Sequence, residues 1–146
     1  LFKKRYAFSN IYEVLNDSIS FLSNSNELVE FNSNNPKHYT YFIFPQNILS
    51  LGIMENKLYC GLRSNGLYYI ENKQLYKANV SGLEKLSITK ILPDTEGNIW
   101  FTTLEKGLFV ARLPQAKSVY QGEVNVVKLI PQKKKINVLL ANNHLL

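Results

Sequence analysis

The stretch GNIWFTTLEKGLFVAR, from Gly97 to Arg112, carries the pattern that decides the fold. The turn-forming cluster DTEGN overlaps its start, and β-branched and aromatic residues then follow without a helical stripe. Such residues fit a pleated strand. The segment LEKG, from Leu104 to Gly107, makes a short connection whose glycine can adopt a positive φ, and GLFVARL returns along the first strand. The stretch therefore predicts a β-hairpin.

The hairpin pattern recurs along the chain. NKLYCGLRSNGLYYIEN matches it without a gap at an offset of 41 residues, SISFLSNSNELVEF at 80 and KINVLLANNHLL at 37. These alignments place Phe21 opposite Phe101, and they place Tyr59, Ser20 and Asn137 at the position of Trp100. An internal repeat of this kind decides the architecture, because each copy is one supersecondary unit.

Each copy has further strand-like segments beside it. The segments NIYEVLND, NILSLGIM, SITKILPD and NVVKLIPQ precede the copies, and HYTYFIFP, QLYKAN and KSVYQ follow three of them. Each full unit thus reads as four short antiparallel strands, called a, b, c and d. A period of about 40 residues with four strands per repeat is typical of a β-propeller blade. The sequence therefore predicts an all-β fold of antiparallel blades with hardly any helix.

The chain as a whole, residues 1–146, is expected to be a single propeller segment of about three and a half to four blades. It would be either part of a larger propeller or a ring completed by strand 1–6 or by a second chain. The predicted divisions are an outer strand at 1–9, blades at 10–45, 46–80 and 86–121, and an incomplete blade at 124–146.

The segment ITKILPDTEGNIWFTTLEKGLF resembles the two-component regulator propeller repeat. The matching residues are Ile91, Asp94, Gly97, Asn98, Ile99, Trp100, Thr103, Gly107, Leu108 and Phe109. The other copies match the repeat less well, so one repeat makes the resemblance specific. The resemblance implies the extracytoplasmic sensor region of a Bacteroidetes-type histidine kinase, of which this chain would be a fragment. It also implies a periplasmic or extracytoplasmic location, with membrane attachment only through the rest of a longer chain.

The motif residues have a structural explanation. Asp94 is expected to cap the a–b turn by accepting backbone N–H groups two residues on. A tryptophan buries a large apolar area, so Trp100 is expected to pack between adjacent blades; a sugar-stacking platform is the alternative. The aromatic residues expected to fill the spaces between sheets with it are Phe21, Phe31, Tyr59, Tyr68, Phe101 and Phe109.

The formal charge of +6 does not indicate a nucleic-acid-binding surface. Six basic residues lie in two clusters, at 3–5 and 133–135, and the remaining basic residues equal the eleven acidic ones in number. No basic stripe interleaved with stacking aromatics is present. The one cysteine, Cys60, and the two histidines, His38 and His144, form no cluster of metal-ligand spacing, so neither a metal nor a cofactor is expected.

The expected function is non-catalytic sensing of a saccharide or another extracytoplasmic signal by loops on a rigid scaffold. Amide and guanidinium groups bond sugar hydroxyls, which makes Arg63, Asn65, Asn24 and Asn26 of the b–c loops the candidate binding residues.

Two alternatives stay open. The first is a scaffold that binds a protein through its rim, and exposed blade faces would also favour self-association. The second is a propeller glycosidase or lyase, for which Glu13 and Asp17 are the candidate carboxylates.

Overall fold

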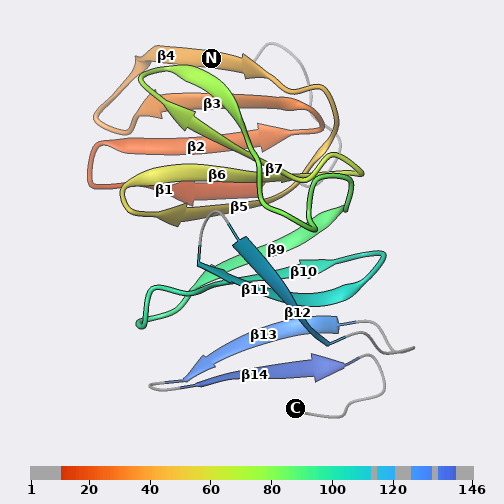
Figure 1. Ribbon diagram of the computed structural model, residues 1–146. Coiled ribbons are helices and arrows are strands. Elements are labelled where there is room, and N and C mark those ends of the chain that lie inside the picture. The colour runs from red at the N-terminus through yellow and green to blue at the C-terminus, as the bar shows by residue number, and fades with distance from the viewer. Residues whose placement is uncertain (1–10, 113–114, 121–125, 133–134, 141–146) are drawn as a thin grey trace.

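The computed structural model describes residues 11–112, 115–120, 126–132 and 135–140 (Figure 1). Within these ranges the strands form three four-stranded antiparallel sheets and one hairpin. The first sheet contains β1 (Ile11–Val14), β2 (Ile19–Asn24), β3 (Glu27–Asn32) and β4 (Asn35–Ile43). The second sheet contains β5 (Ile48–Met54), β6 (Lys57–Leu62), β7 (Leu67–Glu71) and β8 (Gln74–Ala78). The third sheet contains β9 (Ile88–Pro93), β10 (Ile99–Thr103), β11 (Gly107–Arg112) and β12 (Gln115–Tyr120), and the C-terminal hairpin pairs β13 (Val126–Gln132) with β14 (Lys135–Leu140).

The strand order confirms the predicted all-β fold. In each four-stranded sheet the strands lie side by side in chain order, each antiparallel to the last, as the predicted a, b, c and d strands require. The described residues contain no helix, and so none that could cross a membrane. The predicted outer strand at 1–9 and a third strand after β14 lie outside the described residues. The basic cluster at 3–5 and most of the one at 133–135 lie there too.

The sheets stack face to face (Figure 1), and their first strands come closest to one another, β1 against β5 and β5 against β9. Three apolar clusters lie between the layers. Between the first two sheets the buried residues include Phe21, Leu28, Phe44, Leu58, Cys60 and Leu62. Between the second and third they include Tyr59, Leu67, Ile88, Ile91, Phe101 and Phe109. Between the third sheet and the hairpin they are Leu108, Leu129, Val138 and Leu140, with Trp100 partly buried against them.

The predicted alignment of Phe21 with Phe101 is wrong by one residue. Leu108 pairs with Thr102, whereas the equivalent Leu28 pairs with Ser23, so strand b of the first sheet is shifted by one. The cause is the b–c turn, which has two residues between β2 and β3 but three between β10 and β11.

Phe21, rather than Ser20, therefore stands where Tyr59 and Trp100 stand in the later repeats. All three aromatic side chains face the next layer along the chain. An aromatic residue at this position thus recurs in each of the three sheets. That recurrence fits packing between layers better than binding by a single platform.

Phe31 does not fill the predicted space between the first and second sheets. It pairs with Ser20 and Tyr39 and, because side chains alternate along a strand, lies on the face turned away from the second sheet. Tyr12, Tyr41 and Ile43 also project from this face, and they are 55%, 47% and 72% exposed. The first sheet therefore presents an aromatic-rich outer face.

Candidate functional site

The b–c turns and the connections between sheets are joined along one edge of the stack, here called the b–c edge. The backbone N–H of Arg63 donates to the carbonyl of Asn47 at 2.9 Å, and one repeat later Leu104 donates to Ser87 at 3.1 Å. Each bond ties a b–c turn to the connection that precedes its own sheet. These repeated bonds hold the predicted ligand edge in a fixed geometry.

Two of the four predicted binding residues are used in structural contacts at this edge. Asn26 donates its Nδ2 to the carbonyl of Phe44 at 3.0 Å, which fastens the turn to the chain leaving the first sheet. Asn65 accepts a 2.7 Å hydrogen bond from Lys77 Nζ and makes a long contact of 3.4 Å to the Tyr68 hydroxyl. The side-chain amides of both residues therefore already form hydrogen bonds within the protein.

The side chains of the other two predicted residues, Arg63 and Asn24, form no hydrogen bond with another described residue. Arg63 is exposed, and its backbone is anchored by the bond to Asn47. Asn24 is half-buried at the end of β2, where it pairs with Glu27. Arg63 and Asn24 are thus the predicted residues best placed to meet a ligand at the b–c edge.

A carboxylate that the sequence did not indicate lies on the same edge. Glu105 accepts hydrogen bonds from the backbone N–H of Ser87 at 2.8 Å and from its hydroxyl at 2.5 Å. Burial acts to raise the pKa of Glu105, but the two bonds from Ser87 outweigh it and the pKa lies below its usual range. In the sequence Glu105 is an ordinary turn residue of LEKG, and only the fold brings it beside Ser87.

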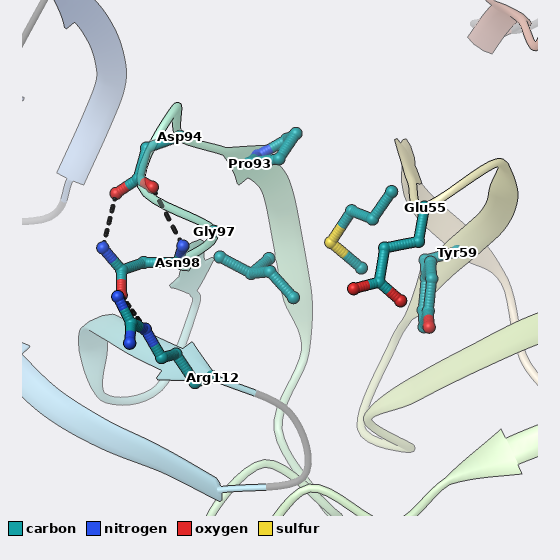
Figure 2. A pocket seen from close by; sticks show the side chains of 9 residues that line it. Glu55, Tyr59, Pro93, Asp94, Gly97, Asn98 and Arg112 are labelled. Atoms are coloured by element: carbon teal, nitrogen blue, oxygen red, sulfur yellow. Dashed lines mark hydrogen bonds between the residues drawn. The ribbon is translucent and has the colours of Figure 1, made fainter.

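A cavity of about 420 Å³ opens on the opposite edge, called the a–b edge, between the second and third sheets (Figure 2). One wall comes from the β5–β6 turn and the start of β6, with Glu55 and Tyr59. The other comes from the β9–β10 turn and the end of β11. The residues lining it are Met54, Glu55, Tyr59, Pro93, Asp94, Gly97, Asn98, Ile99 and Arg112.

Asp94 organises one wall of this cavity. Its Oδ1 accepts the backbone N–H groups of Glu96 and Asn98, both at 2.9 Å, as expected of a residue that caps the turn. Its Oδ2 accepts the Asn98 side-chain amide and the Trp100 Nε1–H, also at 2.9 Å. Burial acts to raise the pKa of Asp94, but the hydrogen bonds from Trp100, Asn98 and Glu96 together lower it below its usual range.

Arg112 extends this network to the rim of the cavity. Its Nε donates to Asn98 Oδ1 and one terminal nitrogen donates to the Glu96 carbonyl, both at 3.1 Å. Figure 2 shows Arg112 and Asn98 on one side of the cavity and Glu55 beside Tyr59 on the other. A positive and a negative side chain thus approach the same space from two different sheets.

The remaining motif residues have local roles. Thr103 donates its hydroxyl to the Gly107 carbonyl at 3.0 Å and accepts the Lys106 backbone N–H at 3.1 Å, which closes the β10–β11 turn. Gly97 and Gly107 have positive φ values of 82° and 76°. Neither Thr103 nor Gly107 lines the cavity described above.

A second cavity, of about 690 Å³, lies beside the β3–β4 hairpin. Its lining residues are Ile19, Glu30, Phe31, Asn32, Lys37, His38, Tyr39, Thr40 and Lys73. His38 is exposed here. Eight of the nine lining residues belong to the first sheet or its turns, and Lys73 comes from the β7–β8 turn of the second sheet.

The carboxylates considered for catalysis lie apart from both cavities. Glu13 is half-buried in β1, where one carboxylate oxygen is 3.4 Å from the Val14 backbone N–H, and Asp17 is exposed in the β1–β2 turn. Among the described residues, no group of three His, Cys, Asp or Glu side chains could hold a metal ion. Cys60 is fully buried, and burial raises the pKa of its thiol far above the usual range.

Two solved structures share this fold. One is the extracellular domain of the hybrid two-component system BT4673 from B. thetaiotaomicron, with a TM-score of 0.70 and 16% identity over 89% of this chain and 19% of that chain. The other shows the extracellular domain of BT4673 described as a one-component system, with a TM-score of 0.69 and 14% identity over 92% of this chain and 21% of that chain. This chain therefore spans about a fifth of the length of either structure. No family model and no curated protein matches it. At these identities the likeness establishes the fold.

Proposed function

We propose that this chain is a ligand-sensing segment of a β-propeller, acting without catalysis in the extracellular part of a two-component sensor. The observation that carries the proposal is the fold shared with the BT4673 extracellular domain over most of the chain. The resemblance of residues 88–109 to the two-component regulator propeller repeat points the same way. In this role the segment binds a signal and passes it to a kinase elsewhere in a longer protein.

The b–c edge is the proposed sensing surface, with Arg63 and Asn24 as its ligand-binding residues. Guanidinium and amide groups supply several hydrogen bonds to hydroxyl-rich ligands such as saccharides. The bonds from Arg63 to Asn47 and from Leu104 to Ser87 hold the backbone of this edge before any ligand arrives. Little conformational entropy is then lost on binding, which favours affinity.

The test is a binding screen of neutral oligosaccharides against the full chain at low and high salt. Saturable binding should survive salt, since screening acts on charges. Arg63→Ala and Asn24→Ala should weaken binding, whereas Thr95→Ala, an exposed change on the a–b edge, should leave it unchanged.

Three outcomes would contradict this proposal. The first is turnover of a saccharide that Glu13→Gln or Asp17→Asn abolishes, which would make the protein an enzyme. The second is tight DNA binding that weakens steeply with salt. The third is full saccharide binding by Arg63→Ala, which would move the sensing site elsewhere.

The outer face of the first sheet favours assembly as a second candidate function. Leu22 of this face is half-buried, whereas the residues at the equivalent position in the later sheets, Cys60 and Phe101, are fully buried. We propose that a second copy of the chain covers this face with one of its own sheets, continuing the stacking seen within one chain. Sedimentation equilibrium should show self-association that Tyr41→Ser with Ile43→Ser abolishes, and a monomer at all concentrations would exclude it.

A further inference from the structure

Two side chains of opposite charge face the cavity at the a–b edge without neutralising each other. Glu55 belongs to the second sheet and Arg112 to the third, and they stand on opposite sides of the space (Figure 2). Neither forms an ion pair with another described residue. The ion pair found among the described residues joins Lys57 to Glu71. The carboxylate of Asp94, which also lines the cavity, already accepts four hydrogen bonds from Glu96, Asn98 and Trp100. The cavity therefore offers a ligand one cationic contact, from Arg112, and one anionic contact, from Glu55.

Hydrogen bonds hold the Arg112 side chain, and a tight turn fixes the backbone of Glu55. Arg112 donates to Asn98 and to the Glu96 carbonyl, and Asn98 is fixed in turn by Asp94. A guanidinium carries five N–H donors, so three of them remain for a ligand. Glu55 lies in a two-residue turn in which it and Asn56 both have positive φ values, 46° and 62°, the geometry that suits a tight hairpin.

Part of the cavity lining is apolar. Met54, Tyr59 and Ile99 line the cavity, and each is at most 8% exposed. The cavity volume of about 420 Å³ falls in the range of small-molecule sites, roughly 300–1,000 Å³. A ligand that fits must combine a positive group, a negative group and an apolar part of a few carbon atoms.

We propose that this cavity binds a free α-amino acid with an apolar side chain. The ligand carboxylate accepts hydrogen bonds from Arg112, its ammonium group pairs with Glu55, and its side chain covers Met54, Tyr59 and Ile99. Charge-assisted hydrogen bonds of this kind are the strong ones. Because the site lies on the opposite edge from Arg63 and Asn24, it is independent of the proposed saccharide surface. A bound ligand would also bridge the second and third sheets.

Isothermal titration calorimetry of the full chain with L-leucine tests the proposal, with 4-methylpentanoate and 3-methylbutylamine as probes that carry one charge each. Leucine should bind saturably and raise the melting temperature, because a ligand that binds only the folded state stabilises it. Each single-charge probe should bind at least about tenfold more weakly, since it leaves one charged side chain without a partner.

Point variants distinguish a specific effect on binding at this site from a general effect on the fold. Glu55→Gln and Arg112→Gln should each weaken leucine binding by about tenfold or more, whereas Lys90→Gln, an exposed change on the same third sheet, should not. Unchanged unfolding curves of Glu55→Gln show that it acts on binding alone. The proposal is overturned if leucine shows no binding at about 10 mM, if either single-charge probe binds as tightly as leucine, or if Glu55→Gln binds leucine normally. Leucine binding without saccharide binding would leave this site standing and remove the b–c edge proposal.

Discussion

The two faces of the second sheet are packed by different means. Toward the first sheet it presents large aliphatic side chains, among them Leu58 and Leu62, which are buried against Phe21. Toward the third sheet, its first two strands present glycines at the positions nearest β9. A Cβ added to Gly52 would lie 2.8 Å from Ile91 Cβ, and one added to Gly61 would lie 2.6 Å from the Ile88 carbonyl oxygen.

The difference shows two ways in which neighbouring sheets pack: large side chains fill the space between them, or glycines let their backbones approach closely. Where β5 and β6 approach β9, the glycines let the isoleucines of β9 rest on the backbone of the second sheet. Ser50 uses the same close approach, donating its hydroxyl to the Ile88 carbonyl at 2.9 Å. The interface with the first sheet should therefore be most sensitive to truncation of a large side chain. The interface with the third sheet should be most sensitive to the enlargement of a glycine.

Phe21→Ala is expected to have the largest effect, because it removes an aromatic ring that is 2% exposed from the cluster between the first two sheets. Truncation of a buried phenylalanine costs about 3–5 kcal/mol. Urea unfolding of the full chain measures this loss. Tyr39→Ala, on the outer face of the same sheet, is the control and should cost far less. Equal losses in the two variants would show that the buried cluster is not the main support of this interface.

Gly61→Ala tests the other face by adding one methyl group. Overpacking of a tight interface costs about 1–3 kcal/mol, and here the upper end is expected because the nearest rigid atom is a backbone oxygen. Ser50→Ala removes the hydroxyl that would also clash with the added carbon, but it leaves the Ile88 carbonyl in place. The double variant should therefore recover little stability. Full recovery would mean that the serine side chain alone limits the space.

The sequence predicted the strands more reliably than the packing between them. Repeated alternation and turn residues define where a hairpin lies, and these local signals placed the b and c strands of the first three copies and the b strand of the fourth. The position of Phe21 was missed because an ungapped alignment cannot detect that one turn is a residue shorter. Gly52 and Gly61 were not singled out, because their role depends on Ile91 and Ile88, which lie about 27 to 39 residues away in the chain.

The candidate sites show the same contrast between local motifs, which the sequence indicates, and contacts between distant segments, which it does not. Asp94, Gly97 and Asn98 belong to one turn, so their motif could be recognised from the sequence. The contacts of Glu105 with Ser87 join different loops, and the facing of Glu55 and Arg112 joins different sheets. Such contacts depend on how the sheets stack, and this stacking cannot be predicted from the sequence of any single segment.

Asp94→Ala tests the β9–β10 turn of the third sheet. The equivalent β5–β6 turn of the second sheet has only two residues, Glu55 and Asn56. The change removes the acceptor of four hydrogen bonds, including that of Trp100, and should cost about 2 kcal/mol, as loss of a strong cap does. Glu55→Ala in the second sheet should stay within about 0.5 kcal/mol. Comparable losses in both turns would show that the hydrogen bonds of Asp94 add nothing beyond the turn itself.

The stability of the same turn should depend on pH in a definite direction. The pKa of Asp94 is lower in the folded protein than its ordinary value near 4, so the folded state favours the charged carboxylate. The stabilisation is complete above the ordinary pKa and is lost as the pH falls from about 4 through the folded pKa. Glu105 has a lowered pKa and acts in the same direction. Unfolding curves measured between about pH 6 and pH 2 should fall less steeply for Asp94→Asn, and parallel curves would contradict the assignment.

Gly97→Ala is expected to have the smallest effect and separates the two reasons for a glycine in this fold. Gly61 lacks space but does not have a positive φ, whereas Gly97 has a φ of 82° and no atom within 4 Å of an added Cβ. Strain at a left-handed position costs about 1 kcal/mol, without any clash to relieve. Gly97→Asn, which tolerates this conformation better, should lose less than Gly97→Ala. If Gly97→Ala cost as much as Gly61→Ala, the close approach of β9 to Gly61 would destabilise the fold no more than left-handed strain does, which would contradict the expected order.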